Sequence, residues 1–455
     1  MIRRLFSSQL RINMVSGIAT TALNTVVVAI AYPVYLHFLG YEKYGVWLVL
    51  STVLSFAQLG NLGIGSAVMK LVAEEHGHSE TKGIQHYVTT ALFLICVSGV
   101  IVLATILVLK EQIIALFGLT DDNAQIALWL LPYIGVLSIY VFIVQIFEAT
   151  LSGLGRMDLA NYRGTIARAT NVTVSGLLLF SGYGVSSLLA GRVVAEIITH
   201  LWLFLGIRRI FGTRILRLDG LDVQRGKRLL SFGGAVLGSS LLNMLFSPLN
   251  KLLLARYAGI ASVPIYEIAL TGSMQIRALV AAGQAALVPE ISRISAEMTT
   301  EARFRISQLY RRSLGLIVLL ATPVFGCLAL FAPILLKLWL GGRFVETLPG
   351  AFRVILLGAF MSVLSLPAYY ILMGSGHVRH NLGAHVVQTI TNLVLLLCIL
   401  VANMVSIKVV CWISSFSMTS TTLYLVLQKG RVFGQPSAGA FRIKTEEVKA
   451  EVVSV

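Results

Sequence analysis

Apolar residues occur along this chain in repeated blocks of about twenty, separated by short polar segments. A helix needs about twenty apolar residues to cross roughly 30 Å of hydrocarbon. Twelve such blocks can be placed. Their approximate ranges are 13–38, 44–69, 87–109, 125–151, 163–182, 185–206, 229–254, 263–287, 313–334, 351–374, 384–403 and 405–427. The pattern therefore predicts an all-α polytopic membrane protein with twelve transmembrane helices.

The polar segments between the blocks alternate between rich and poor in cations. One set holds 26 Lys and Arg residues, at 1–12, 70–86, 152–168, 206–228, 288–312, 375–383 and 428–455. The other set holds six, namely Lys43, Lys110, Arg256, Lys337, Arg343 and Lys408. Cytoplasmic loops of membrane proteins carry such an excess of Lys and Arg. We therefore expect both termini in the cytoplasm and an even number of spans.

The two halves of the chain resemble each other. Four pairs of residues recur at an offset near 220 positions: Gly155 and Gly376, Asn171 and Asn392, Gly40 and Gly259, and Tyr44 and Tyr266. Six spans per half is an even number, so we expect parallel lobes related by a pseudo-twofold axis along the membrane normal. By analogy at the level of fold, this is the plan of alternating-access transporters, with a substrate site between the halves.

These patterns give an expected division of the chain into four parts. An N-terminal six-helix lobe covers 1–206, and a cytoplasmic linker loop covers 207–228. A C-terminal six-helix lobe covers 229–430. The polar remainder, 431–455, has no apolar face of useful width and is expected to be a cytoplasmic tail.

The composition agrees with a membrane protein and excludes several other classes. The chain is 56% hydrophobic and 12% charged, whereas soluble domains are about 25% charged. The net charge of +16 is explained by the cytoplasmic loops, and the basic residues are not interleaved with aromatics as on a nucleic-acid surface. The four cysteines lie in apolar blocks without CxxC spacing, so we expect no disulfide or metal site. No nucleotide-binding motif is present, and no cofactor is expected.

The stretch "GSMQIRALVAAGQ" (272–284) places Arg277 near the middle of an expected span. A cation at the centre of the bilayer costs at least about 2.5 kcal/mol, and such residues are usually functional. Gln284 lies seven residues further on and shares its face of the helix. We expect Arg277 and Gln284 to line a cavity and to meet an anionic substrate. The alternative is an intramembrane ion pair between Arg277 and a carboxylate of another span.

Other charged residues in the spans have simpler interpretations. Arg192 and Glu196 are four residues apart on one helix face and are expected to neutralise each other. Lys251 and Glu267 flank a short hairpin and are expected to pair across it. The cations Arg192 and Lys251 remain candidates for attracting an anion.

Polar residues in the second and fourth blocks are further candidates. Gln58 and Asn61, in "FAQLGNLGIG", are three residues apart on one face, among glycines that permit close helix packing or local unwinding. Glu148, in the inner half of the fourth block, is a candidate for H⁺ or Na⁺ coupling, as is Glu196.

The segment "YLHFLGYEKYGVWLVLSTVLSFAQLGNLGIGSAVMKLVAE" (35–74) resembles the polysaccharide and oligosaccharide flippases of the MOP superfamily. The likeness continues in "NKLLLARYAGIASVPIYEIAL" and at the turn Gly374-Ser375-Gly376, and it covers roughly residues 10–430. Many relatives carry acidic residues where this chain has Asn61 and the Asn250-Lys251 pair. This departure argues against cation coupling at those positions and for a more positive cavity.

The resemblance implies a two-lobe, twelve-helix transporter rather than an enzyme. Such a protein would flip a polyprenyl-pyrophosphate-linked oligosaccharide across the bacterial inner membrane by alternating access. Its partners would be the lipid-linked oligosaccharide, membrane lipids, and polymerase and glycosyltransferase enzymes, but no nucleic acid. Two alternatives remain: a multidrug or small-molecule exporter of the same superfamily, and a membrane-embedded glycosyltransferase or polymerase.

Overall fold

The computed structural model describes residues 8–78, 80–211, 221–285, 287–297 and 299–433, and no strand occurs within these residues. Its elements are α1 (Ser8–Ala57), η2 (Gln58–Asn61), α2 (Ile64–Gly77), α3 (Thr81–Val108), α4 (Lys110–Phe117), α5 (Asp121–Gly153), α6 (Met157–Phe180), α7 (Ser186–Phe211), α8 (Val223–Tyr257), α9 (Ser262–Ala285), α10 (Val288–Ser295), α11 (Thr300–Leu340), η4 (Gly341–Arg343), α12 (Thr347–Leu364), α13 (Leu366–Gly374), α14 (Val378–Val401) and α15 (Ile407–Phe433). The expected all-α fold is confirmed.

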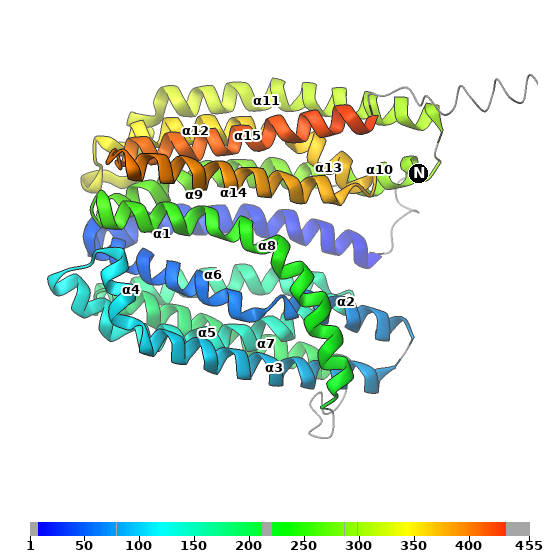
Figure 1. The fold of residues 1–455 in the computed structure, drawn as a ribbon, viewed down its shortest axis with the longest axis horizontal. Coiled ribbons are helices and arrows are strands. Elements are labelled where there is room, and N and C mark those ends of the chain that lie inside the picture. The colour runs from blue at the N-terminus through cyan, green and yellow to red at the C-terminus, as the bar shows by residue number, and fades with distance from the viewer. Residues whose placement is uncertain (1–7, 79, 212–220, 286, 298, 434–455) are drawn as a thin grey trace, which may run out of the picture.

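The helices form two bundles that lie side by side (Figure 1). One bundle contains α2 to α7, the other contains α9 to α15, and the first part of α1 and the helix α8 lie between them. The described ends of the chain, at α1 and α15, lie at the same end of the molecule. An even number of crossings has this consequence, so the arrangement agrees with the expected topology.

All twelve expected spans fall on helices, but the helices differ in hydropathy. Among the described residues, eight helical segments are long and apolar enough to cross a membrane, and the first of these, Ala19–Asn61, covers most of two expected spans. The helices α6, α8 and α9 do not meet this criterion because they carry more polar residues. These three helices border the cavity described below. The protein is a multi-pass membrane protein, and the exact count of twelve crossings stays a prediction.

A glycine with a positive φ forms the turn between the first two spans. Helical hydrogen bonding continues along α1, but Gly40 has φ 67° and ψ −175°, which breaks the helix into two arms. The turn between α8 and α9 contains Gly259 with φ 84°. Because this backbone conformation is costly for residues with a Cβ atom, both hairpins need glycine.

The expected duplication is visible in the backbone of the last spans of each half. Helices α6 and α14 begin and end 221 positions apart, and α7 and α15 begin 221 positions apart. The turn before α6 has amide-to-carbonyl bonds 154→150, 155→152 and 156→151, and the turn before α14 has 375→371, 376→373 and 377→372. Gly155 and Gly376 have φ values of 77° and 81°. The same backbone is therefore built twice.

Helix α8 contacts both bundles. Its N-terminal part crosses α2 so closely that a Cβ atom on Gly63 would lie 2.1 Å from the carbonyl oxygen of Gly233. Near the same end, Arg228 donates to the hydroxyl of Tyr87 at 3.0 Å. The C-terminal part of α8 packs in the other bundle, where Asn250 donates to the hydroxyl of Tyr266 at 2.9 Å. A single helix therefore connects the two bundles.

The ends of the expected parts fall partly inside helices. Helix α7 continues to Phe211 and α8 begins at Val223, so parts of the expected linker 207–228 are helical. Positions 212–220 of that linker and 434–455 of the expected tail lie outside the described residues. The four-part division of the chain stays a prediction.

Prolines inside the helices leave carbonyl groups that other segments bond. Pro33 lacks an amide hydrogen, so the carbonyl of Ala29 has no intrahelical donor, and the indole of Trp339 donates to it at 2.7 Å. Pro333 similarly frees the carbonyl of Ala329, which accepts from Nε of Arg353 at 2.7 Å. The first of these bonds joins α11 to α1, across the two bundles.

Candidate functional site

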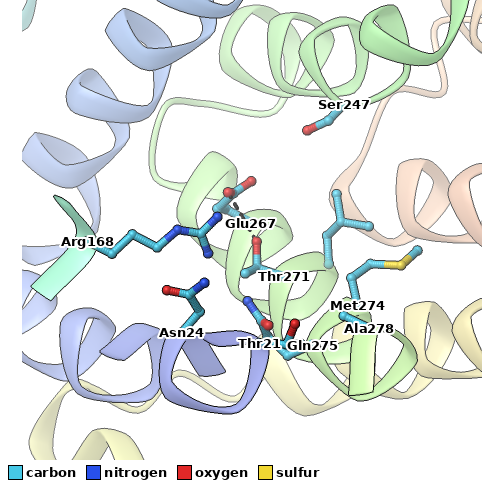
Figure 2. Close-up of a pocket in the computed structure, with 10 residues that line it drawn as sticks. Thr21, Asn24, Arg168, Ser247, Glu267, Thr271, Met274, Gln275 and Ala278 are labelled. Carbon is cyan, nitrogen blue, oxygen red and sulfur yellow. Dashed lines mark hydrogen bonds between the residues drawn. The ribbon is translucent and has the colours of Figure 1, made fainter. Parts of the chain in front are cut away.

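A cavity of about 450 Å³ lies between the two bundles. Figure 2 shows its lining residues, which come from α1, α6, α8 and α9: Thr21, Asn24, Arg168, Ser247, Glu267, Leu270, Thr271, Met274, Gln275 and Ala278. The residues from α9 recur every three or four positions and so form one face of that helix. One wall of the cavity therefore belongs to the first half of the chain, and the opposite wall belongs to the second half.

The neutral polar residues of the cavity offer hydroxyl and amide groups. Thr25 donates to the side-chain oxygen of Gln275 at 3.2 Å, which ties α1 to α9 at the edge of the cavity. Thr271 donates to the carboxylate of Glu267 at 3.2 Å. Asn24, Thr21 and Ser247 add further donors and acceptors. Groups of these kinds can form hydrogen bonds with sugar hydroxyls and with phosphate oxygens.

Arg168 is the cation that enters this cavity, and it was not among the expected site residues. Its guanidinium points toward the α9 side of the cavity (Figure 2). Within the described part of the chain Arg168 forms no hydrogen bond and no ion pair with an acidic side chain, and its side chain is exposed. The guanidinium is therefore exposed to the space of the cavity and able to accept an anionic ligand.

Glu267 is the acidic residue of the cavity lining, but its charge is already neutralised. Nζ of Lys251 lies 2.8 Å from Oε2 of Glu267, and these side chains are 12% and 17% exposed. The predicted ion pair across the α8–α9 hairpin is thus confirmed. With this pair formed, the lining retains the charge of Arg168 alone, and the cavity is positive.

Arg277 lies on a different side of α9 from the cavity lining. Its Nε donates to Oγ of Ser362 on α12 at 2.7 Å, and it lies within electrostatic range of Tyr369, Tyr370 and His385. Arg277 forms no ion pair among the described residues, so the alternative of a carboxylate partner finds no support. Its terminal nitrogens are not buried unpartnered atoms. The guanidinium is therefore only partly enclosed by its neighbours.

Gln284 does not form a continuous stripe with Arg277. Its side-chain oxygen accepts a hydrogen bond from Ser313 of α11, and it does not line the cavity. Gln275, two residues before Arg277, lines the cavity instead. A role for Arg277 and Gln284 in substrate binding stays a prediction.

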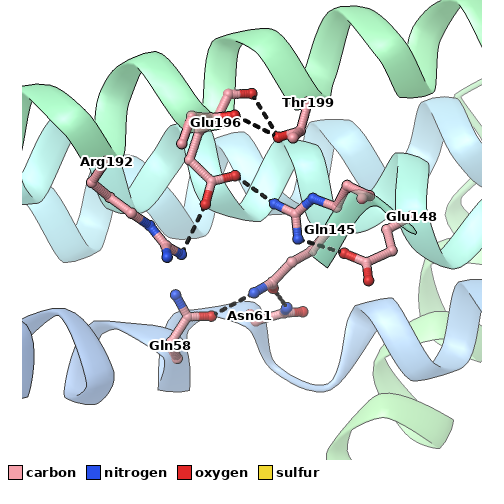
Figure 3. Close-up of polar contacts among 9 residues, drawn as sticks. Gln58, Asn61, Gln145, Glu148, Arg192, Glu196 and Thr199 are labelled. Carbon is pink, nitrogen blue, oxygen red and sulfur yellow. Dashed lines mark hydrogen bonds and ion pairs between the residues drawn. The ribbon is translucent and has the colours of Figure 1, made fainter. Parts of the chain in front are cut away.

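Gln58 and Asn61 lie in the short helix η2, where the second span unwinds. Asn61 donates to the side-chain oxygen of Gln145, and Gln145 donates to that of Gln58 at 2.9 Å (Figure 3). Leu62 and Gly63 then adopt positive φ values before α2 begins. Both expectations for this segment, close packing and local unwinding, are met, and its three amides are bonded to one another.

A network of two arginines and two glutamates lies beside these amides in the first bundle. The expected pair of Arg192 and Glu196 is present, with Nη2 and Oε1 2.8 Å apart. Glu196 also pairs with Arg163 of α6, and Arg163 pairs with Glu148 of α5 at 2.8 Å. Figure 3 shows Glu148 and Glu196 facing each other across this network. Coupling of transport to H⁺ or Na⁺ through either carboxylate stays a prediction, because both are already paired with arginines.

Arg163 and Arg168 are counted with the expected cytoplasmic segment 152–168, and they also fall at the start of the expected span 163–182. The structure begins α6 at Met157, which places both arginines inside the helix. Arg163 is 12% exposed and paired, so it is not a loop cation in contact with the cytoplasm. Their spacing of five residues directs one toward the network and the other toward the cavity. When Arg163 and Arg168 are left out of the count, the segments expected in the cytoplasm still hold most of the Lys and Arg residues.

The sequence model of a family described as "Polysaccharide biosynthesis protein" matches residues 12–295, which is more than half of the chain. This chain belongs to that family. The match includes η2, the network of the first bundle, Arg168 and the α9 wall of the cavity. The resemblance inferred from the hairpin patterns is therefore confirmed.

Individual relatives agree with this family. A protein of Shigella flexneri named "Putative O-antigen transporter" is 22% identical over 368 residues, which is 79% of this chain and 83% of the relative. An inward-facing multidrug resistance MATE family transporter of the MOP superfamily matches with a TM-score of 0.71 at 15% identity, covering 94% of this chain and 95% of its own. A MOP superfamily transporter of Pyrococcus furiosus, whose binding pocket has reverse polarity, matches with a TM-score of 0.63 at 14% identity over 94% and 95% of the two chains. The chain therefore has a transporter fold.

Proposed function

We propose that this protein flips a lipid-linked oligosaccharide with an anionic phosphate head across the bacterial inner membrane. The observation that carries the proposal is the cavity between the bundles, in which Arg168 is unpaired while the one lining carboxylate is held by Lys251. A guanidinium binds phosphate oxygens with charge-assisted hydrogen bonds. The surrounding hydroxyl and amide groups suit a glycan. Family membership and the relative named for O-antigen transport support this cargo.

In this mechanism the two parts of the cargo follow different routes. The polyprenyl tail stays in the bilayer, where it is already solvated by lipid, so its movement meets no electrostatic barrier. The charged head and its sugars cannot enter hydrocarbon without losing hydration. Arg168 and the polar lining replace part of that hydration inside the cavity. The protein therefore lowers the barrier where it is highest.

The contacts between the bundles support access from the expected cytoplasmic side. At the expected outer end, Nη2 of Arg343 donates to the carbonyl of His37 at 2.9 Å, and the hydroxyl of Tyr41 donates to the carbonyl of Arg343 at 2.9 Å. The bond from Trp339, near the end of α11, also joins α1 to the segment formed by α11 and η4. We propose that these contacts close the outer end while cargo enters, and that they separate when it is released outside. Both termini are cytoplasmic in this proposal.

The cargo also defines the partners. A lipid-linked oligosaccharide is assembled by glycosyltransferases and, after translocation, is used by a polysaccharide polymerase. We propose that the protein acts between these enzymes and has no catalytic step of its own.

Transport by purified protein in liposomes tests the role of Arg168. We expect Arg168→Gln to lower the initial rate of translocation of a labelled lipid-linked oligosaccharide by about tenfold or more, because a hydrogen bond to a charged group contributes about 1.5–3 kcal/mol. Arg168→Lys should retain part of the rate. The exposed Arg303, at the start of α11, provides the matched control Arg303→Gln, which should transport normally. Equal translocation rates in Arg168→Gln and in the unaltered protein would contradict the proposal.

The same liposomes distinguish this function from export of cationic drugs. We expect no accumulation of a cationic dye, because the cavity is positive once Lys251 has paired with Glu267. Dye transport by the unaltered protein, without oligosaccharide transport, would instead identify a small-molecule exporter.

A further inference from the structure

A second pocket lies at the end of the first bundle, at the turn between α5 and α6 and the last turns of α7. Its volume is about 390 Å³, and it is lined by Leu151, Arg156, Leu159, Trp202, Leu205, Gly206 and Arg209. It shares no lining residue with the cavity between the bundles. The cargo site proposed above therefore does not include it.

The pocket combines an apolar floor with two arginines. Leu151 is fully buried, and Leu159 and Trp202 pack against the core of the bundle. Arg156 is held in place by Asp158, whose carboxylate oxygens accept from Nε and Nη2 at 3.0 and 3.1 Å. Arg209 is exposed and forms no ion pair with an acidic side chain of the described chain. With Asp158 counted, the pocket keeps one net positive charge.

The ends of three helices show where the pocket lies. Helix α5 ends at Gly153, α6 begins at Met157 and α7 ends at Phe211, so the pocket lies where the chain leaves the membrane. Tryptophan and arginine are the residues expected at the depth of the lipid headgroups. Leu205 is 52% exposed beside Arg209, as a residue facing acyl chains would be. The charge and the apolar surface therefore lie at the depths of the two parts of a phospholipid.

We propose that this pocket binds an anionic phospholipid. The phosphodiester would bind Arg209 and Nη1 of Arg156, the guanidinium nitrogen that does not bond Asp158, and the upper part of one acyl chain would lie against Leu205 and Trp202. Basic pockets between transmembrane helices bind anionic headgroups in this way. The proposal depends on the membrane location of the chain and not on its cargo. A result that contradicts lipid binding here would therefore not contradict oligosaccharide transport, and the reverse is also true.

Lipid binding to the full-length protein tests this site. The protein is placed in nanodiscs of phosphatidylcholine with a minor fraction of brominated phosphatidylglycerol, and quenching of tryptophan fluorescence is measured. The part of the quenching that disappears in Trp202→Phe reports this pocket. We expect brominated phosphatidylglycerol to quench that part more strongly than brominated phosphatidylcholine at the same fraction.

Neighbouring arginines provide a matched pair of variants. Arg209→Gln should reduce the apparent affinity for phosphatidylglycerol by about fivefold, which corresponds to about 1 kcal/mol for one cation near the surface. Arg208→Gln removes the same charge one residue away, outside the pocket lining, and should have little effect. Equal effects of both variants, or equal quenching by both lipids, would overturn the proposal, because the site would then show only general surface attraction.

Filling the pocket gives an independent measurement. A Cβ atom on Gly206 would be 3.8 Å from Leu159 and 4.0 Å from Leu151, which are ordinary contacts, so a small side chain is tolerated there. We expect Gly206→Leu to occupy the apolar part and to lower binding of phosphatidylglycerol, while Gly206→Ala folds and binds nearly normally. Displacement of the lipid by inorganic phosphate at similar concentration would show a phosphate site and would overturn the assignment to a lipid.

Discussion

The two halves of this protein share a backbone but differ in how their interiors treat charge. Met69 and Val72 contact Gly153 as Val288 and Ile291 contact Gly374, so positions 219 apart correspond in this region. By that offset, Gln58 of the first half corresponds to Arg277 of the second.

Around Gln58, two arginines and two glutamates neutralise one another. Around Arg277, the neighbours are Ser362, two tyrosines and a histidine, with no carboxylate partner within the described residues. At these two places the duplication therefore preserved the architecture, while the charges around Gln58 are closed into pairs and Arg277 is left open, without a carboxylate partner among the described residues.

The largest expected effect concerns the paired charges of the first half. We expect Arg163→Ala to lower the free energy of unfolding by about 3–5 kcal/mol, because it leaves the buried Glu196 short of a partner and Glu148 without its ion pair. Arg277→Ala removes one hydrogen bond and no carboxylate partner, and should cost about 1 kcal/mol. Thermal unfolding in detergent measures both.

A double variant identifies the cause of this loss. Arg163→Met combined with Glu196→Gln should recover part of the stability, since it removes the charge of the buried Glu196 together with that of Arg163. Glu148 and Arg192 then lose their partners, but they are 31% and 34% exposed and so cost less as single charges. If the single Arg163 and Arg277 variants unfold at the same temperature, the contrast between paired and open charges is wrong.

The next effect concerns transport and the open cation. Arg277→Gln gives the second half the residue that the first half has at this place. We expect the protein to remain folded and the rate of oligosaccharide translocation to fall by about tenfold, the order of one charge-assisted hydrogen bond. Rates are measured in liposomes at matched protein amounts. Normal transport by both Arg277→Gln and Arg277→Lys would exclude Arg277 from the mechanism.

The backbone shared by the halves gives a smaller, symmetrical effect. Gly155 and Gly376 both have a positive φ, and a Cβ atom on either meets no atom within 4 Å. Replacement by alanine should therefore cost only the strain of the left-handed conformation, about 1 kcal/mol at each site. Asparagine, which tolerates this conformation better, should cost less at both. Unfolding temperatures that differ clearly between the two alanine variants would mean that the turns are not equivalent.

The smallest effect is a difference in pH dependence between the same two turns. Burial favours a higher pKa for Asp158, but the hydrogen bonds and charge of Arg156 outweigh it and hold the pKa below 3.8. Its contribution to stability is therefore complete above that value and is lost as the pH falls through the lower, folded pKa. In the other turn, burial, followed by the charges of Arg379 and His377, holds the pKa of His380 below 6.5. Because the folded state disfavours protonation of His380, the stability of this turn begins to decrease as the pH drops below 6.5.

Hydrogen exchange measures this difference directly. After correction for the intrinsic rates, exchange at residues 375–381 should increase slightly as the pH falls below about 6.5, while residues 154–160 should stay unchanged until about pH 4. A simultaneous change in both turns would contradict the assignment to these two groups.

The fold was predictable because hydropathy and charge act over short segments. Blocks of apolar residues located the helices, and pairs close in sequence, such as Arg192 with Glu196 and Lys251 with Glu267, could be inferred from spacing. Family membership was also accessible, because glycines such as Gly40 are required by the backbone of the turns.

The site was harder to predict because its chemistry depends on contacts between distant segments. Arg168 fell both in the cation-rich segment 152–168 and in the expected span 163–182, and only the structure shows that it lines a cavity. Seven-residue spacing predicted Arg277 and Gln284 on one face of α9, but Arg277 bonds Ser362 of α12 and Gln284 bonds Ser313 of α11. Spacing alone does not determine which side of a helix faces a cavity, and here that side carries Gln275 and Glu267.

Pro33 in α1 affects the energy that is needed to separate the two bundles at the outer end. Ala29 has a carbonyl that its own helix cannot satisfy, and the indole of Trp339 on the opposite bundle supplies the missing donor. A carbonyl in hydrocarbon without a donor costs several kcal/mol. When the bundles part, we expect water to reach this carbonyl or α1 to change its bend, so that the first helix responds directly to the separation of the halves.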